Sequence, residues 1–166
     1  TEAQRPETFD QYNRTPEFEK VNFHLDVEGF KGIFWLEYLH RLLGRTIGIV
    51  FLVPFILFVA SGRIRAREIP RYLLMFVIGG LQGLLGWYMV KSGLVDNPHV
   101  SQYRLTAHLG LAVLIYAYML HVALALWSDR QPLAVSAGLR RVTSLLAAAV
   151  FITILSGGFV AGLKAG

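Results

Sequence analysis

The sequence predicts an all-α membrane protein, a polytopic bundle in which four helices span the bilayer. Of the 166 residues, 54% are hydrophobic and 16% are charged, and the mean hydropathy is +0.48. Such a chain is too apolar and too poor in charge for an ordinary soluble domain. Its apolar residues form four runs, each near the ~20 residues that a helix needs to cross a bilayer. The absence of cysteine excludes disulfides, thiol catalysis and Cys-ligated metal clusters.

Polar flanks set the expected limits of each span. Residues 1–31 are polar and mixed in charge, which predicts a loop or a short amphipathic region outside the bilayer. Pro54 is expected to kink the first span near its far end. The spans are expected at about 33–60, 72–90, 105–127 and 142–163, joined by loops at 61–72, 92–102 and 128–141.

The distribution of positive charge predicts the orientation of the chain. The net charge is +5, and most of the arginines fall in two loops, 61–72 and 128–141. Strict alternation puts these loops on one side, which the positive-inside rule makes the cytoplasmic or mitochondrial matrix side. The charge is therefore a topology signal, and we expect no nucleic-acid binding. The arginines concerned are Arg63, Arg65, Arg67 and Arg71 in the first loop and Arg130, Arg140 and Arg141 in the second.

Two histidines occupy matching places in the first and third spans. His40 and His108 are each expected roughly 7–12 Å below the outer boundary, at ~1.5 Å of rise per residue. Ionisable groups inside an apolar span are costly, so a functional role is the default interpretation. Two imidazoles at one depth can ligate one metal centre, and we predict a heme iron. The alternative for either residue is a structural histidine with its hydrogen bonds satisfied.

The residues that follow on the first span support the same interpretation, although each has an alternative. Glu37 precedes His40 by three residues, so the two share one helix face. Glu37 could instead pair with Arg41, four residues further on. Gly44 and Gly48 continue the face and would leave a flat surface for a porphyrin plane, or would let another helix approach closely.

Cations near the outer ends of the spans are candidate partners for heme propionates. Arg104 precedes His108 by four residues, which places a guanidinium one turn closer to the outer surface on the same face. Arg41 and Lys91 add positive charge at the outer rim. Carboxylates commonly take such partners. The alternative for each cation is that it snorkels to lipid headgroups.

Other histidines and glycines receive structural interpretations. His24 and His99 are expected to be solvated in outer loops. His121 lies thirteen residues beyond His108, so ~20 Å deeper; it is expected at the inner interface, a second heme being the alternative. Gln82 is expected to hydrogen-bond a neighbouring helix, a ligand being the alternative. Close helix packing is expected for the glycines of the second span, at 79–86, and for Gly158, Gly162 and Gly166.

Four stretches of the chain resemble the heme A synthases of aerobic bacteria and mitochondria. They are EYLHR at 37–41 followed by Gly44, QGLLGWYMVKSGL at 82–94, VSQYRLTAHL at 100–109 and SGGFVAGL at 156–163. The runs at 15–18 and 30–35 are similar to the outer loop of the alphaproteobacterial and mitochondrial branch. The resemblance covers nearly the whole chain.

This resemblance implies an eight-helix bundle of two similar halves, of which the chain corresponds to helices two to five. Residues 1–32 would be an outer polar loop, 33–141 three helices of the N-terminal heme-binding half, and 142–166 the first helix of the second half. The chain is therefore expected to be part of a longer protein. The implied location is a bacterial plasma membrane or a mitochondrial inner membrane.

The implied reaction oxidises the C8 methyl group of heme O to a formyl group and makes heme A for cytochrome oxidase. Glu37 would be catalytic, His40 and His108 would be the axial ligands of the iron, and Arg41 and Arg104 would be further heme-binding residues. Heme O would bind in this half and heme b in the other. The implied partners are heme O, the lipid bilayer and an electron donor, with heme O synthase and a second copy of the chain as further candidates.

Two other functions remain open from the residues alone. A di-histidine electron carrier resembling a cytochrome b subunit would bind heme without modifying it. A non-catalytic assembly module would use its glycine faces for helix packing and would bind no heme. Glu37 distinguishes the synthase from the carrier, because a carrier needs no acid beside the ring.

Overall fold

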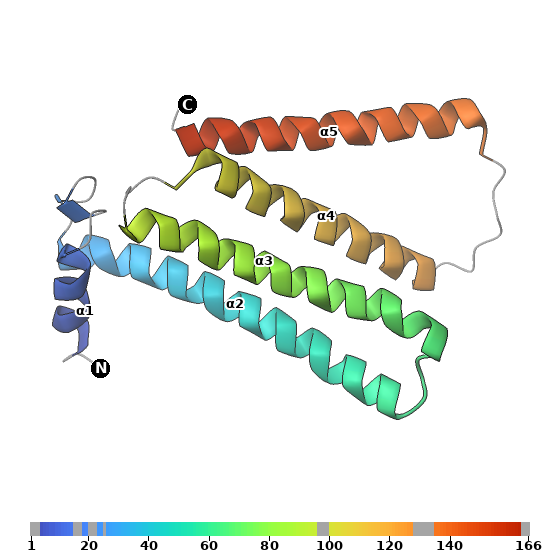
Figure 1. Cartoon of the computed structure of the whole chain (residues 1–166), viewed down its shortest axis with the longest axis horizontal. Helices are drawn as coiled ribbons and strands as arrows, with labels where there is room; N and C mark the ends of the chain where they lie inside the picture. The colour runs from blue at the N-terminus through green and yellow to red at the C-terminus, as the bar shows by residue number, and fades with distance from the viewer. Residues whose placement is uncertain are drawn as a thin grey trace. The chain divides into compact units, whose positions relative to one another are not determined.

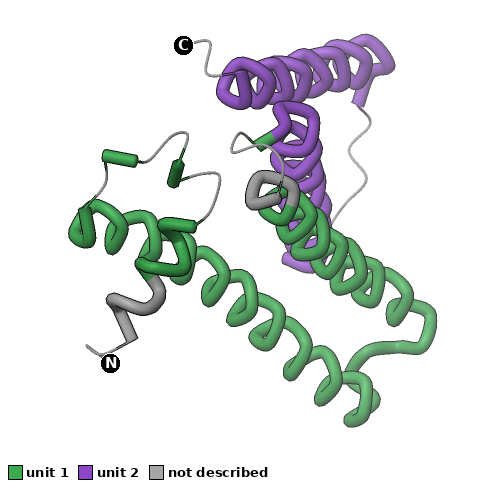
Figure 2. The backbone as a smooth tube through the Cα atoms, turned by 60° about the vertical axis from the view of Figure 1, so that its left-hand side comes forward, with its two compact units in different colours: residues 1–100 green, residues 101–166 purple. Residues whose placement is uncertain are grey.

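The computed structural model describes residues 4–14, 18–19, 23–24, 26–95, 100–127 and 135–163. Within these ranges the chain is mainly helical and has no strand. It divides into two compact units, residues 1–100 (unit 1) and 101–166 (unit 2), coloured separately in Figure 2. Four helices are long and apolar enough to cross a membrane, which confirms the predicted fold class (Figure 1). They are α2 (Val27–Ala60), α3 (Ile69–Val95), α4 (Gln102–Trp127) and α5 (Ala137–Leu163).

Unit 1 begins with a short helix, α1 (Gln4–Asn13), where the sequence predicted a polar loop or an amphipathic region. Aromatic rings hold α1 against the start of α2. The ring of Phe30 lies 5.4 Å from that of Phe9 and 4.8 Å from that of Tyr12, between centroids. Phe18 contacts the same two rings of α1 at 6.0 and 5.6 Å. This cluster fixes the polar N-terminal segment at one end of the first spanning helix.

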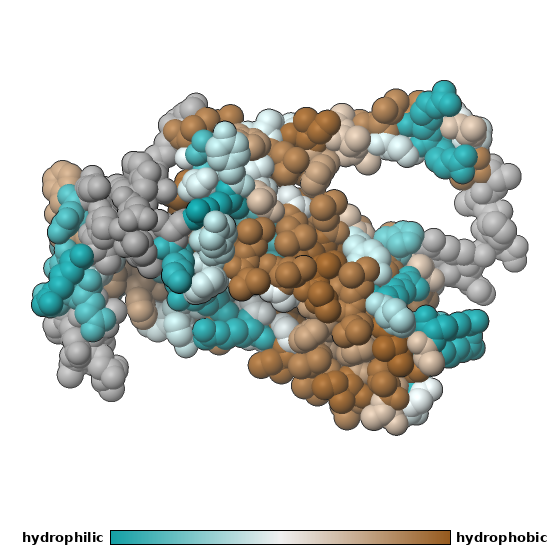
Figure 3. Space-filling view, in the orientation of Figure 1, coloured by the Kyte–Doolittle hydropathy of each residue, from teal (hydrophilic) through white to brown (hydrophobic). Residues whose placement is uncertain are grey.

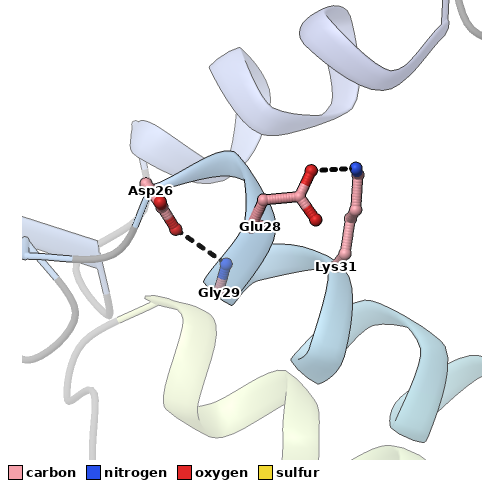
Figure 4. A network of polar contacts seen from close by, with 4 residues as sticks. All are labelled: Asp26, Glu28, Gly29 and Lys31. Carbon is pink, nitrogen blue, oxygen red and sulfur yellow. Dashed lines mark hydrogen bonds and ion pairs between the residues drawn. The ribbon is translucent and has the colours of Figure 1, made fainter.

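Helix α2 begins at Val27, earlier than the predicted start at residue 33, because the polar residues before the apolar run can also form helix. Asp26 caps it: its Oδ1 accepts a hydrogen bond from the backbone N–H of Gly29 at 2.8 Å (Figure 4). In the first turn Glu28 pairs with Lys31. The negative charge of Glu28 is favourable at a helix N-terminus. With 34 residues, α2 is ~50 Å long. It therefore extends well beyond a hydrocarbon core of ~30 Å.

A tight turn ends α2 and leads into the basic segment. Gly62 adopts φ +68°, a left-handed conformation that glycine adopts without strain. The backbone N–H groups of Ser61 and Gly62 donate to the carbonyls of Leu57 and Val59, at 2.9 and 3.1 Å. This arrangement satisfies the last carbonyls of the helix. Pro54 lies inside α2, and the kink expected there stays a prediction.

A short 3-10 helix, η2 (Ala66–Glu68), then leads into α3. Helices α2 and α3 pack near the ends that this turn joins. The rings of Phe51 and Phe76 stack with centroids 6.3 Å apart, and Phe55 lies 6.3 Å from Tyr72. Figure 2 shows the two helices close together at the turn and further apart toward their other ends. The hairpin is thus held by aromatic contacts in one half of its length.

Unit 2 is a hairpin of α4 and α5 whose helices pack through glycines. Gly158 and Gly162, which were expected to form a packing face with no identifiable partner, lie directly against α4. Gly166 falls outside the described residues. On α3, by contrast, a Cβ atom built on Gly79, Gly80 or Gly83 would meet no atom within 4 Å. At these three glycines no close packing is found among the described residues, and for Gly86 it stays a prediction.

Two further boundaries differ from the prediction because helices continue past the apolar core. Helix α3 runs to Val95 and so includes part of the expected loop at 92–102. Helix α5 begins at Ala137, so Arg140 and Arg141 lie in its first turns instead of in a loop. Ser136 supports this start, since its Oγ accepts from the backbone N–H of Leu139 at 3.2 Å. Figure 3 shows apolar surface along the middle of the helices and polar residues toward their ends.

The aromatic cluster yields a test of how α1 is held. Replacing Phe30 by Ala removes its ring contacts with α1, each worth about 0.5–1.5 kcal/mol. We expect limited proteolysis in the segment 14–26 to become about fivefold faster or more, as a loss of ~1 kcal/mol would give. The matched control is Phe23→Ala, because the ring of Phe23 is exposed and lies against His24. Equal cleavage rates in the two variants would contradict the assignment.

Candidate functional site

Glu37 and His40 lie one turn apart on α2, in the half that is not packed against α3. Glu37 forms an ion pair with Arg41, the alternative that the four-residue spacing had left open. The side chains of Glu37 and Arg41 are 45% and 55% exposed, and His40 is also exposed. The Glu37–Arg41 pair compensates the carboxylate charge within one helix. It also holds the Glu37 carboxylate in a defined place, one turn before the His40 imidazole in the sequence.

His40 and His108 lie at the same distance from the basic ends of their helices, the ends next to the arginine-rich segments. His40 precedes Ala60 by 20 residues and His108 precedes Trp127 by 19. At 1.5 Å per residue both distances are about 29–30 Å. His40 belongs to unit 1 and His108 to unit 2, so the match is one of depth along each helix. Counted from the other ends the depths differ, because His40 follows Val27 by 13 residues and His108 follows Gln102 by 6.

The glycines below His40 border open space. A Cβ atom at Gly44 or Gly48 would meet no atom within 4 Å in the part of the chain that the structure describes. At about 100° per residue, both glycines lie within ~20° of the direction of Glu37, and His40 lies ~60° to one side. The packing alternative for these glycines stays open. What remains is a strip without side chains, next to an imidazole and a carboxylate, that a flat ligand could cover.

On α4, His108 and Arg104 lie on the side away from α5. Thr106 and Gly110 face α5, and His108 is ~160° around the helix from each of them. Arg104 is on the same side as His108, one turn further from the basic end. Both residues are half-buried. Helix α5 therefore contacts the side of α4 opposite His108.

Lys91, the third cation predicted at the rim, packs on an aromatic ring. Its ammonium lies 4.8 Å from the centroid of the Trp87 ring on α3, a cation–π contact. This contact holds a positive charge near the end of α3 that is remote from the basic segment. Lys91 and Arg41 thus each interact with a residue of their own helix.

Arg45 is a charged residue of α2 that the sequence analysis did not select. It lies five residues beyond His40, ~7.5 Å closer to the basic end, and is exposed. Among the described residues it forms no hydrogen bond or ion pair. The sequence could have indicated Arg45, because a guanidinium inside an apolar run is itself a functional candidate.

The remaining candidates contribute no further ligand set. No group of three or more His, Cys, Asp or Glu side chains occurs among the described residues. Two imidazoles alone suit a heme iron, whose other four ligands are porphyrin nitrogens, better than a zinc site. His121 is exposed on α4, and His24 is exposed beside Phe23. His99 falls outside the described residues, and Gln82 is half-buried on α3.

Comparisons with known proteins match the whole chain. The family model COX15-CtaA, described as "Cytochrome oxidase assembly protein", matches residues 1–166. A protein of Nitrosospira multiformis named "Heme A synthase" is 54% identical over 166 residues, which cover 96% of this chain and 46% of that protein. One of Paramagnetospirillum magneticum with the same name is 51% identical over 167 residues, covering 95% and 46%.

A third relative, from Parvibaculum lavamentivorans and also named "Heme A synthase", is 44% identical over 166 residues. That match covers 100% of this chain and 48% of the relative. The chain thus spans about half the length of the curated relatives it matches. No solved structure matches it.

Proposed function

Because the chain belongs to the cytochrome oxidase assembly protein family COX15-CtaA, we propose that it forms part of a heme A synthase. Such an enzyme is an integral membrane oxidoreductase that converts the C8 methyl group of heme O to a formyl group. The observation that carries the proposal is the match to three proteins of that name over nearly the full chain. Four helices able to cross a membrane agree with it.

We assign His40 on α2 and His108 on α4 as the residues that would ligate the iron of the substrate heme. Their equal distance from the basic ends of the two helices supports this assignment. The open strip at Gly44 and Gly48 supports it as well, since it leaves room for a planar ring beside His40. When bound, the heme supplies both the iron and the methyl group that is oxidised.

Glu37 is the catalytic residue in this proposal. Its carboxylate lies one turn from His40. With the heme bound it would accept or return a proton, or offset positive charge, at this position. The ion pair with Arg41 orients the carboxylate. Arg41 consequently acts mainly as the partner of Glu37, and binding of a heme propionate is its secondary role.

Arg104 is the residue that we assign to a heme propionate. It lies one turn from His108 on the same side of α4, and a guanidinium can bind a carboxylate through two hydrogen bonds. Lys91 adds positive charge from α3. Arg104 would hold the propionate on the part of α4 remote from its basic end, the end that we assign to the cytoplasm or the mitochondrial matrix.

The chain contributes to both halves of the proposed enzyme. Residues 33–141 belong to the half that binds heme O, and residues 142–166 begin the half that binds heme b. The oxidation draws on an external oxidant together with an electron donor, both outside this chain, in a bacterial plasma membrane or a mitochondrial inner membrane. A di-histidine electron carrier is the second candidate function. The Glu37–Arg41 ion pair favours this carrier, because an ion pair within α2 gives Glu37 a structural role.

The proposal predicts which variants lose heme A. The protein at its full natural length is expressed with heme O, and its hemes are extracted and identified by chromatography and mass. Glu37→Gln should lower the rate of heme A formation about 100-fold or more, the usual effect of losing an acid–base residue. His40→Ala and His108→Ala should abolish it. The control is His121→Ala, which removes an exposed histidine of α4 far from the site.

Two outcomes of this experiment would count against parts of the proposal. A parent protein that holds only unmodified heme, with Glu37→Gln indistinguishable from it, would support the electron carrier. Normal heme A formation by Glu37→Gln would leave the synthase in place and remove Glu37 from catalysis.

A second prediction concerns the open strip. Gly44→Leu places a bulky side chain where the ring is proposed to lie, and such overpacking costs about 1–3 kcal/mol. The heme content of the purified protein should fall about tenfold, which corresponds to ~1.4 kcal/mol. Gly32→Leu is the control, because Gly32 is also on α2 and also borders open space. If both variants kept parental heme absorbance, the ring would not lie on this strip.

A further inference from the structure

We propose that α5 is a positioning helix for His108, and that Gly158 and Gly162 set the height and rotation of this ligand by their contact with α4. The inference rests on the proposed function, because it requires His108 to ligate the iron. It assigns a role in the heme site to two residues that are remote from the ring. These glycines are positioning residues, since neither is proposed to touch the heme.

The contact at Gly162 brings the two backbones together. A Cβ atom on Gly162 would lie 2.5 Å from the Cα of Gln102 and 2.7 Å from its Cβ. Carbon atoms approach favourably to about 3.5–4.0 Å, so any side chain here would require a shift. Because the opposing atom is a Cα, that shift must involve the backbone of α4.

The contact at Gly158 lies one turn from the contact at Gly162, on α5 as well as on α4. Its Cβ atom would lie 3.0 Å from Oγ1 and 3.3 Å from Cα of Thr106. Thr106 is only 5% exposed, and its hydroxyl has no hydrogen-bond partner among the described residues. Two glycines four residues apart on α5 thus pack against two residues four apart on α4. This arrangement allows helices to approach closely in membranes.

Two more contacts hold the same stretch of α4. The Tyr103 ring meets that of Phe159 edge-on, with centroids 5.5 Å apart. A Cβ atom on Gly110 would lie 2.8 Å from Cδ2 of Leu155. The contacts therefore fall on both sides of His108 in sequence, within residues 102–110. The part of α4 that bears the proposed ligand is the part that α5 holds most closely.

The geometry of α4 links this contact to the ligand. His108 is ~160° around the helix from Thr106 and Gly110, so α5 does not cover it. A helix moves as a rigid rod over two turns, and a displacement of its backbone therefore carries the imidazole with it. An iron–imidazole bond tolerates little displacement, and groups that orient a ligand from outside the metal site typically affect metal affinity 10–100-fold. Gly162→Ala should move α4 by ~1 Å, from 2.5 Å toward an ordinary contact.

The test uses the protein at its full natural length, loaded with heme O. Low-spin heme is measured by absorbance and electron paramagnetic resonance, and heme retention by transfer to apomyoglobin. Gly162→Ala should keep its helix content and monodispersity, lose part of the low-spin signal and retain heme about tenfold less tightly. Gly157→Ala is the matched control, because a Cβ atom on this neighbouring glycine meets nothing within 4 Å.

A rescue pair keeps the test decisive if Gly162→Ala does not fold. Gly158→Ala should give a smaller loss of low-spin signal, because its closest contact is the Thr106 hydroxyl. Adding Thr106→Ala removes that oxygen and should restore the parental signal, whereas adding Thr106→Ser keeps the oxygen and should not. Removing this hydroxyl should itself cost little, since it has no partner in the described part of the chain.

The outcomes separate this inference from the proposed function. If His108→Ala abolishes the low-spin signal of heme O, measured as the part of the spectrum that heme b of the other half does not supply, while both glycine variants keep parental spectra and retention, the positioning role is wrong and the ligand role stands. If Thr106→Ala fails to restore the Gly158→Ala signal, the inference is also wrong. If His108→Ala keeps the parental signal, the ligand role fails, and the positioning role fails with it.

Discussion

The absence of water from the bilayer core is the constraint on which the rest of this structure depends. Every backbone N–H and C=O group in the core must be satisfied within the protein, which leaves long helices as the form that these four apolar segments adopt. The same constraint makes a charge inside a span costly unless it has a partner. Glu37 meets this requirement with Arg41 on its own helix. The few polar groups that remain in the apolar runs are therefore informative about function.

Glycine serves two different purposes in this chain, and the contacts distinguish them. On α5, Gly158 and Gly162 lie so close to α4 that a Cβ atom would meet backbone atoms. On α2, Gly44 and Gly48 border open space beside His40. The first arrangement fixes one helix against another, and the second leaves a strip of α2 without a contact among the described residues.

The sequence predicted the elements well because its strongest signals are the apolar runs. All four spanning helices were predicted, and the errors lie at their ends, where capping residues extend a helix beyond the hydrocarbon. Asp26 and Ser136 are such caps, and hydropathy does not register them. The N-terminal segment was also underestimated, because its order comes from contacts between rings such as Phe9 and Phe30 that are distant in sequence.

The local contacts of the candidate residues were predictable only in part, and their assignment to a heme site stays a prediction. Helical spacing placed Glu37 near His40 and allowed the ion pair with Arg41, but spacing alone could not decide whether the pair forms. It also could not assign a partner to Gly158 and Gly162, because nothing in a glycine pattern specifies which helix it faces. Arg45 was within reach of the sequence analysis, since a charge in an apolar run needs no structure to be noticed.

The central claim is that His40 and His108 ligate one heme iron, and redox titration of ligand variants tests it most directly. A methionine in place of an axial histidine raises the potential of a heme. We predict that His40→Met and His108→Met, each in the protein at its full natural length with heme O bound, raise the midpoint potential of the same heme. His121→Met should leave it unchanged. Parental potentials in either of the first two variants would contradict ligation by that histidine and with it the shared site.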